Sequence, residues 1–251
     1  MRVMLSLMVL LAMPLFASGS QENSDKPGTR KIVVACDATF PPMEFLNSDV
    51  ELAGFTIDTV RAIERLSGVD IEIVNTSWDG IFAGLENENY DAIFSSVTIT
   101  DERQKRYDFS NPYVNAGQVI LVQKEQKGLA TLADLSGLPV GVKIGTTGAI
   151  AAAKNELIEL RNYDDIGLAV ADLANSNLVA VVVDSPVAAN YVLGNDNYSD
   201  KLKIVGEVLT EEYYGVVVRK GDAKLLQFFN EEIKKLADSG ELEQLEKKWL
   251  G

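Results

Sequence analysis

The sequence predicts an α/β fold built on mainly parallel sheets. Short β-rich runs alternate along the chain with longer runs whose apolar residues recur every three or four positions. This alternation is typical of βαβ units. Several of the β-rich runs are continuously apolar, which indicates buried strands. With 251 residues, 47% of them hydrophobic, the chain is long enough for one large core or two smaller ones.

The expected elements follow one another in a regular order. We expect strands at residues 31–37, 70–76, 90–97, 118–124, 139–145, 178–185, 201–209 and 213–221. We expect helices at residues 54–68, 78–89, 146–157, 165–177, 185–194, 224–240 and 240–250, and a short helix that begins at residue 101. The helix at 54–68 illustrates the evidence, because its apolar residues Ile57, Val60 and Ile63 have helical spacing and Gly68 can end it.

The first 20 residues have the pattern of a secretory signal peptide. Arg2 precedes an apolar stretch that is too short to span a bilayer convincingly, and small residues follow it. Residues 21–29 are a polar linker. We therefore expect a soluble protein in the periplasm or otherwise outside the cytoplasm. No cysteine stands near Ser20 to carry a lipid anchor.

The composition argues against several classes of function. Beyond residue 20 the chain has 37 acidic and 22 basic residues, a net charge of −15, so nucleic acid is not an expected partner. Histidine is absent, which excludes Ser-His-Asp and Cys-His catalysis. The glycines at 145 and 148 lack the spacing of a phosphate-binding loop. We expect no catalytic residue, no metal and no cofactor.

Polar residues end several of the predicted strands. Asp37, Thr98, Lys143 and Asp184 stand at these positions. In open α/β sheets, ligands bind at the carboxyl ends of the strands. An acid, a hydroxyl, a base and a second acid together favour a small polar ligand that carries both charges.

The segment after Thr98 places an arginine near the start of a helix. Thr100 is a suitable N-cap, and Arg103 then falls at about the third helical position. An arginine there is explained if it clamps an anion, because its planar fork matches a carboxylate. The alternative is a surface arginine paired with Glu102 or Asp108, and the motif alone does not decide between the two.

Motifs distributed over residues 30–251 resemble the extracellular solute-binding proteins of bacterial polar amino-acid ABC transporters. The most specific segments are VVACDATFPPMEF, ELAGFTIDTVRAIE, SWDGIFAGLENENYDAIFSSVTITDERQKRYDFSNPY, VGVKIGTTGAIAA, VVVDSP, YYGVVVRKG and SGELEQLEKKWLG. The resemblance implies a periplasmic-binding-protein fold of type II, with two α/β lobes joined by two crossing strands. Lobe 1 would be residues 30–113 plus 213–251, and lobe 2 residues 118–209. We expect a monomer that works with a membrane permease.

The resemblance also implies individual roles. Arg103 would clamp the α-carboxylate of an amino acid, with the backbone N–H groups of Thr98 and Thr147 as further donors. Asp184 would bind the α-ammonium, helped by the Thr98 hydroxyl and the Ser96 carbonyl. Phe40 and Trp78 would hold the ligand side chain between their rings. Asp37 and Lys143 would make polar contacts with that side chain, and Ser95 would be a further contact.

The identity of the ligand is ambiguous in the sequence. Ser95 and Ser96 resemble binders of basic amino acids, whereas Lys143 resembles glutamine binders. Asp37 and Lys143 together favour a neutral, glutamine-type ligand, with an arginine or lysine type as the alternative, and Glu44 could reverse the balance if Lys143 pairs with a nearby acid. Two departures from related binders, Phe40 in place of tyrosine and Val183 in place of histidine, remove polar groups from the pocket.

Two other classes of function fit the same fold. A dehydratase resembling cyclohexadienyl dehydratases would need a carboxyl group in the cleft, for which Asp37 and Glu44 are candidates. A ligand-sensing partner of a membrane receptor would signal by closing. We favour the binding protein because the chain offers few groups for catalysis.

Overall fold

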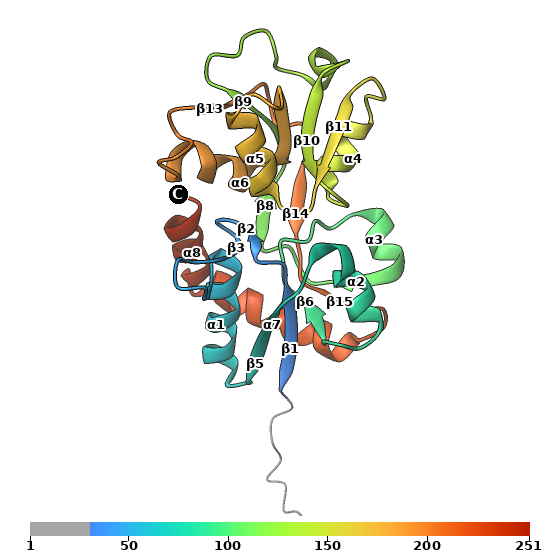
Figure 1. The fold of residues 1–251 in the computed structure, drawn as a ribbon. Helices are drawn as coiled ribbons and strands as arrows, with labels where there is room; N and C mark the ends of the chain where they lie inside the picture. The colour runs from blue at the N-terminus through green and yellow to red at the C-terminus, as the bar shows by residue number, and fades with distance from the viewer. Residues whose placement is uncertain (1–30) are drawn as a thin grey trace, which may run out of the picture.

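The computed structural model describes residues 31–251 and has two α/β lobes, one above the other in Figure 1. The predicted signal peptide and linker, residues 1–20 and 21–29, lie outside the described residues. Each lobe contains one five-stranded sheet with helices packed around it. The predicted α/β class and type II architecture are therefore confirmed.

Lobe 1 is built on a sheet with the strand order β5-β1-β6-β15-β7. Its strands are β1 (Ile32–Cys36), β5 (Ile71–Asn75), β6 (Ala92–Ile93), β7 (Tyr107–Phe109) and β15 (Val217–Arg219). Its helices are α1 (Phe55–Ser67), α2 (Trp78–Glu86), α3 (Asp101–Arg106), α7 (Ala223–Asp238) and α8 (Glu241–Trp249). A small antiparallel sheet of β2 (Thr39–Phe40), β3 (Glu44–Leu46) and β4 (Leu52–Ala53) completes the lobe.

Lobe 2 is built on a sheet with the order β11-β10-β12-β9-β13. Its strands are β9 (Gln118–Gln123), β10 (Pro139–Lys143), β11 (Glu159–Tyr163), β12 (Ala180–Asp184) and β13 (Leu202–Val205). Its helices are the 3-10 helix η1 (Leu132–Leu135), α4 (Thr147–Ala153), α5 (Ile166–Ala174), α6 (Ser185–Ala189) and the π-helix η2 (Asn190–Gly194).

Both large sheets are mixed in the same way. In lobe 1, β1 pairs in parallel with β5 and β6, whereas β15 pairs antiparallel with β6 and β7. In lobe 2, β10 pairs in parallel with β11 and β12, whereas β9 pairs antiparallel with β12 and β13. The parallel strands β1, β10 and β12 end at Cys36, Lys143 and Asp184. Their carboxyl ends therefore bring polar residues to the space between the lobes.

A two-stranded ribbon connects the lobes. It pairs β8 (Val114–Ala116) with β14 (Glu212–Tyr214) in antiparallel register, with Glu212 opposite Ala116. Figure 1 shows both strands running between the two large sheets. A buried apolar cluster is continuous through this junction and includes Tyr113, Tyr214 and Val183. The exact limits of the two bodies, at residues 113, 118, 209 and 213, stay a prediction, as does hinge motion there.

Three expected strands differ from the structure. The strand expected at 90–97 is paired only at Ala92–Ile93, and the buried chain beyond it bends, with Ser96 at a φ of 49°. The strand expected at 201–209 is also shorter, at Leu202–Val205, but it lies away from the junction of the lobes. The strand expected at 213–221 is divided into β14 and β15. A Cβ atom at Gly215 would lie 3.0 Å from the Ile99 side chain, so a larger residue at this crossing of the chain would require Ile99 to shift. In the first and third of these strands, tertiary contacts at the junction override local strand preference.

Candidate ligand-binding cleft

A narrow cavity lies between the two lobes. The lining residues are Asp37, Phe40, Glu44, Trp78, Ser95, Ser96, Thr98, Arg103, Lys143, Thr146, Thr147 and Asp184. The structure thus brings together every site residue predicted from the sequence, and it adds Glu44 and Thr146.

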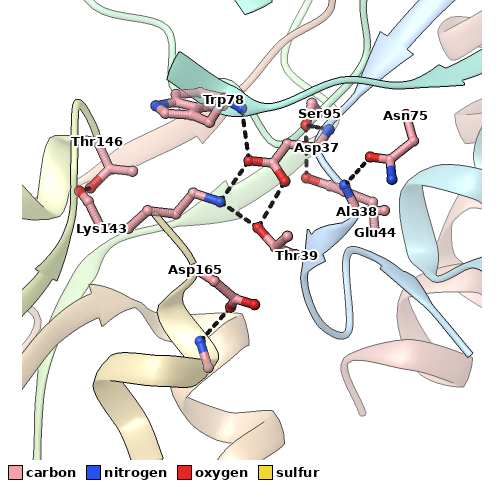
Figure 2. Close-up of polar contacts among 11 residues, drawn as sticks. Asp37, Ala38, Thr39, Glu44, Asn75, Trp78, Ser95, Lys143, Thr146 and Asp165 are labelled. Carbon is pink, nitrogen blue, oxygen red and sulfur yellow. Dashed lines mark hydrogen bonds and ion pairs between the residues drawn. The ribbon is translucent and has the colours of Figure 1, made fainter. Parts of the chain in front are cut away.

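Asp37 and Lys143 form a buried ion pair across the cleft. Lys143 Nζ lies 2.7 Å from Asp37 Oδ2 and also donates to Thr39 Oγ1 at 2.6 Å, and both charged side chains are almost fully buried. Figure 2 shows that the same Asp37 carboxylate accepts hydrogen bonds from the Thr39 hydroxyl and from the backbone N–H of Trp78, the first residue of α2. Lys143 and Asp37 are therefore largely satisfied by protein groups.

Glu44 is a buried acid in the wall of the cavity. It begins β3 opposite Phe40, and its side chain is only 1% exposed. Its carboxyl oxygens accept from Ser95 Oγ at 3.2 Å and Ser96 Oγ at 2.9 Å. Burial raises the pKa of this carboxyl to about 8, although hydroxyl groups such as those of Ser96 and Ser95 oppose the rise. The left-handed backbone at Ser96 is uncommon for a residue other than glycine and is of the kind that collects at functional sites.

Arg103 lies where the sequence predicted. It belongs to α3, and its backbone N–H donates to the side chain of the N-cap Thr100 at 3.2 Å. Its guanidinium donates to the carbonyl of Thr98 at 2.9 Å and, across the cleft, to the carbonyl of Gly145 at 3.3 Å. Gly145 has a φ of 70°, a left-handed conformation that glycine adopts without strain.

Two aromatic rings lie close to the Arg103 guanidinium. Its Cζ atom is 5.6 Å from the Trp78 ring centroid and 5.4 Å from that of Phe82, within the range of cation–π attraction. Burial lowers the pKa of this guanidinium, while the negative charges of Asp184 and Glu212 oppose the shift. An arginine nevertheless stays protonated in proteins, so it supplies a fixed positive charge.

Asp184 supplies a buried acid from lobe 2. It is the last residue of β12 and is 5% exposed. One carboxyl oxygen, Oδ1, accepts a hydrogen bond from the Tyr214 hydroxyl at 2.7 Å. Burial raises the pKa of Asp184 to about 6, and the nearby Glu212 charge adds to the rise, whereas hydrogen bonds from Tyr214 and Gln118 oppose it. A cation bound beside Asp184 would favour its ionised form.

Sequence reasoning does not find three contributing residues, and it names Glu44 only as a candidate cleft acid and as an acid that could favour a basic ligand. The three are Thr146, which N-caps α4, Phe82, which packs on Arg103, and Glu212, which accepts hydrogen bonds from the Thr98 and Thr147 hydroxyls behind the cavity wall. A charged residue inside the run Pro42-Met43-Glu44-Phe45 was a usable signal for Glu44, because an acid among apolar residues must find partners when buried. Glu212 gave no comparable signal.

The described residues also bear on metals and membranes. From residue 31 onward, no group of three or more Cys, Asp or Glu side chains is arranged to hold a metal ion. Over the same part of the chain, no helix has the length and apolar character needed to cross a bilayer.

Two α/β lobes joined by a ribbon, with a polar cavity between them that holds charges of both signs, define a solute-binding protein of the two-lobed, hinged class. The chain belongs to the bacterial extracellular solute-binding proteins, family 3, whose family model matches residues 32–251.

Relatives and solved structures support this membership. The chain is 34% identical to the L-cystine-binding protein TcyJ of Escherichia coli K12 over 88% of the chain and 82% of that protein. It is 35% identical to a probable histidine-binding protein of Neisseria gonorrhoeae over 86% of the chain and 82% of that protein.

Among solved structures, a mutant of the arginine-binding protein ArgBP from T. maritima superposes with a TM-score of 0.82 at 39% identity, over 89% of this chain and 95% of that one. An ancestral arginine-binding protein bound to glutamine has a TM-score of 0.82 at 36% identity, over 88% of this chain and 98% of that one. The ancestral amino acid-binding protein AncCDT-1, a precursor of cyclohexadienyl dehydratase, has a TM-score of 0.82 at 34% identity, over 90% and 97%.

Proposed function

We propose that the protein captures a free polar L-amino acid between its lobes and delivers it to the permease of an ABC transporter. The observation that carries this proposal is that Arg103 from lobe 1 and Asp184 from lobe 2 line the same cavity and bring opposite charges to it. The guanidinium would bind the α-carboxylate as a fork, and Asp184 would bind the α-ammonium. A ligand with both charges contacts both lobes and so favours the closed arrangement.

The backbone beside Arg103 supports the carboxylate assignment. Thr147 is the first residue of α4, where helix N–H groups have no intrahelical acceptor. Its backbone N–H can therefore donate to one oxygen of the ligand carboxylate. The backbone N–H of Thr98 would donate from the other lobe. Phe40 and Trp78, both in the cavity lining, would hold the aliphatic part of the ligand side chain between their rings.

For the side-chain end, we propose a basic ligand of arginine type. The glutamine-type expectation required Lys143 and Asp37 to serve the ligand together, but Lys143 is bonded to Asp37 and Thr39 instead. Glu44 is also an acid of the cavity wall, and it accepts hydrogen bonds from the Ser95 and Ser96 hydroxyls. These partners are neutral and do not balance a negative charge. A guanidinium or ammonium group would compensate its charge.

The names of similar proteins support a basic or neutral polar ligand. They include binders of arginine and a probable binder of histidine, and one ancestral arginine-binding protein was solved with glutamine. The preference for glutamine stays a prediction from the sequence, and competition between the two amino acids decides it.

A thermal-shift screen of the wild type against the twenty amino acids tests the function. We expect arginine, lysine or histidine to raise the melting temperature most, because a ligand at 100 times its Kd stabilises the folded state by about 2.7 kcal/mol. Competition between arginine and glutamine, followed by calorimetric titration, then ranks the two. If glutamine displaces arginine, the basic assignment is wrong. If no amino acid shifts the melting temperature, the binding function itself is wrong.

Arginine binding at pH 7 is expected to release about one proton per ligand. The pKa of the Glu44 carboxyl in the free cavity is about 8, so it is mostly protonated at pH 7, whereas a bound guanidinium requires the carboxylate. Because the bound state holds fewer protons, affinity should rise with pH between about 6 and 8. Titrations in buffers of different ionisation enthalpy measure the released protons.

Two variants isolate the source of that proton. Glu44→Gln cannot titrate and should abolish most of the release, leaving only a small contribution from Asp184, whose pKa is about 6. Glu51→Gln is the matched control, because Glu51 is exposed just before β4. Release that persists at full size in Glu44→Gln would contradict the assignment.

A lyase on the same fold is the second candidate, because the similar protein AncCDT-1 is a precursor of cyclohexadienyl dehydratase and a buried acid with a raised pKa suits proton transfer. Incubation with prephenate or arogenate would reveal it by the appearance of an aromatic product.

A further inference from the structure

Glu212 occupies an unusual position at the junction of the lobes. It begins β14 in the connecting ribbon and is 8% exposed. Its Oε2 atom accepts from Thr147 Oγ1 of lobe 2 at 2.6 Å and from Thr98 Oγ1 of lobe 1 at 3.0 Å. The same oxygen lies 3.3 Å from Gln118 Nε2, and Oε1 accepts from Thr210 Oγ1 at 2.7 Å. One carboxylate thus collects hydroxyl groups from both lobes and from the ribbon.

These contacts fix the direction of two hydroxyl protons. A hydroxyl has one proton to donate, and a carboxylate can only accept. Thr98 Oγ1 and Thr147 Oγ1 also lie 3.2 Å apart, but a hydrogen bond to an ionised acceptor is roughly twice as strong as one between neutral groups. Both protons are therefore directed to Glu212. Thr147 Oγ1 also accepts from Gln118 Nε2 at 3.1 Å, so each threonine oxygen keeps at least one lone pair that can accept from a ligand.

At this point the two threonine hydroxyls accept hydrogen bonds but do not donate them into the cavity. Thr98 and Thr147 line the cavity together with Asp184, whose carboxylate has further lone pairs beyond those that accept from Tyr214 and Gln118. A group with several N–H donors is matched by such acceptors. A ligand with a hydroxyl group in place of the α-ammonium could donate only one hydrogen bond here. A des-amino ligand could donate none.

We infer that Glu212 is a positioning residue that makes this wall selective for the α-ammonium group. The inference rests on the proposed amino-acid binding and extends it to a residue that does not line the cavity. Glu212 acts through Thr98 and Thr147, and its effect should appear only for ligands that carry the ammonium group.

The test compares an amino acid with its des-amino analogue. L-arginine and 5-guanidinopentanoic acid are titrated calorimetrically into the wild type and into Glu212→Gln. The amide of glutamine is neutral and accepts hydrogen bonds only about half as strongly as a carboxylate, so it no longer holds both threonine protons away from the cavity as firmly. We expect arginine to bind about 10- to 100-fold more weakly and the analogue to change less than about twofold.

The ratio of the two affinities separates this role from a structural one. If Glu212 only stabilises the closed arrangement, both ligands should lose affinity by the same factor, and the inference is wrong. Glu211→Gln is the matched control, since Glu211 is exposed and bonded to the Tyr213 hydroxyl; both affinities should stay at the wild-type value. If no amino acid binds the wild type, the proposed function fails first and this inference with it. If another amino acid binds instead of arginine, that amino acid and its des-amino analogue take the place of the two ligands.

A second variant keeps the test decisive if Glu212→Gln does not fold. Thr147→Val removes one of the two hydroxyls and leaves Glu212 in place. We expect it also to weaken arginine more than the analogue, and an equal loss for both ligands would overturn the inference.

Discussion

Arg103→Ala is expected to weaken amino-acid binding by about 30-fold to several thousand-fold. Removing one partner of a desolvated charged hydrogen bond costs about 2–5 kcal/mol. Arg103 lines the cavity, and its guanidinium lies within cation–π range of the Trp78 and Phe82 rings. The α-carboxylate is common to all amino acids, so the loss should be similar for arginine and glutamine. Calorimetric titration of both ligands measures it.

The same variant should fold normally. Arg103 is half-buried in a six-residue helix, and the Thr100 cap depends on the backbone N–H of residue 103, which alanine retains. The melting temperature without ligand should therefore change little. Near wild-type affinity in a folded Arg103→Ala protein would show that the α-carboxylate is bound elsewhere.

Two companion variants define the mechanism of the loss. Arg103→Lys should also bind poorly, because a point charge cannot replace a planar fork that donates to two oxygens. Arg106→Ala is the matched control: it lies on the same helix, is exposed, and pairs with Glu86 at the surface. It should bind amino acids with unchanged affinity, since surface ion pairs contribute little.

The sequence predicted the carboxyl-end residues of the site because they follow from chain order alone. Asp37, Lys143 and Asp184 directly follow or end buried strands, and parallel strands bring such ends to one edge of a sheet. The position of Arg103 followed from the capping pattern at Thr100. These features depend on local sequence, so they could be recognised without the fold.

The remaining features depend on contacts between distant segments. Glu44 enters the cavity because β2 and β3 pair through a short turn, and strands of two or three residues leave no periodic pattern to detect. The pairing of Lys143 with Asp37 joins residues 106 positions apart in sequence. Which of several acids a lysine will meet is decided by the packing of the lobes, and this pairing changed the expected ligand class.

Glu212 shows the same limit more clearly. In sequence it is one of two adjacent glutamates before Tyr213, and nothing in the pattern separates them. In the structure Glu211 is exposed, whereas Glu212 is buried among hydroxyl groups of both lobes. Exposed and buried residues alternate from Glu211, just before β14, to Tyr214, but only the fold determines which of them face the cleft.

Asp184→Asn is expected to weaken the binding of every amino acid by a similar factor. Asparagine keeps the shape and can still accept from the Tyr214 hydroxyl, as Asp184 Oδ1 does at 2.7 Å, so the lobe should fold normally. It loses the charge that would pair with the α-ammonium. We expect a loss of about 2–5 kcal/mol, equal for arginine and glutamine, and little change for 5-guanidinopentanoic acid. Asp200→Asn, on an exposed lobe 2 loop before β13, is the matched control.

The pH dependence of binding gives an independent check on Asp184. Its pKa is raised to about 6 in the buried site, and a bound ammonium requires the ionised carboxylate, so the bound state holds fewer protons than the free one. Affinity should then fall as pH falls through 6, by up to about tenfold per unit well below it. Measuring this in a Glu44→Gln background removes the titration of Glu44 near pH 8. Adding Asp184→Asn should flatten the profile between pH 4.5 and 7. A profile that still falls in the double variant would mean that another acid holds the ammonium group, and Glu212 would be the first to examine because it lies close enough to shift the pKa of Asp184.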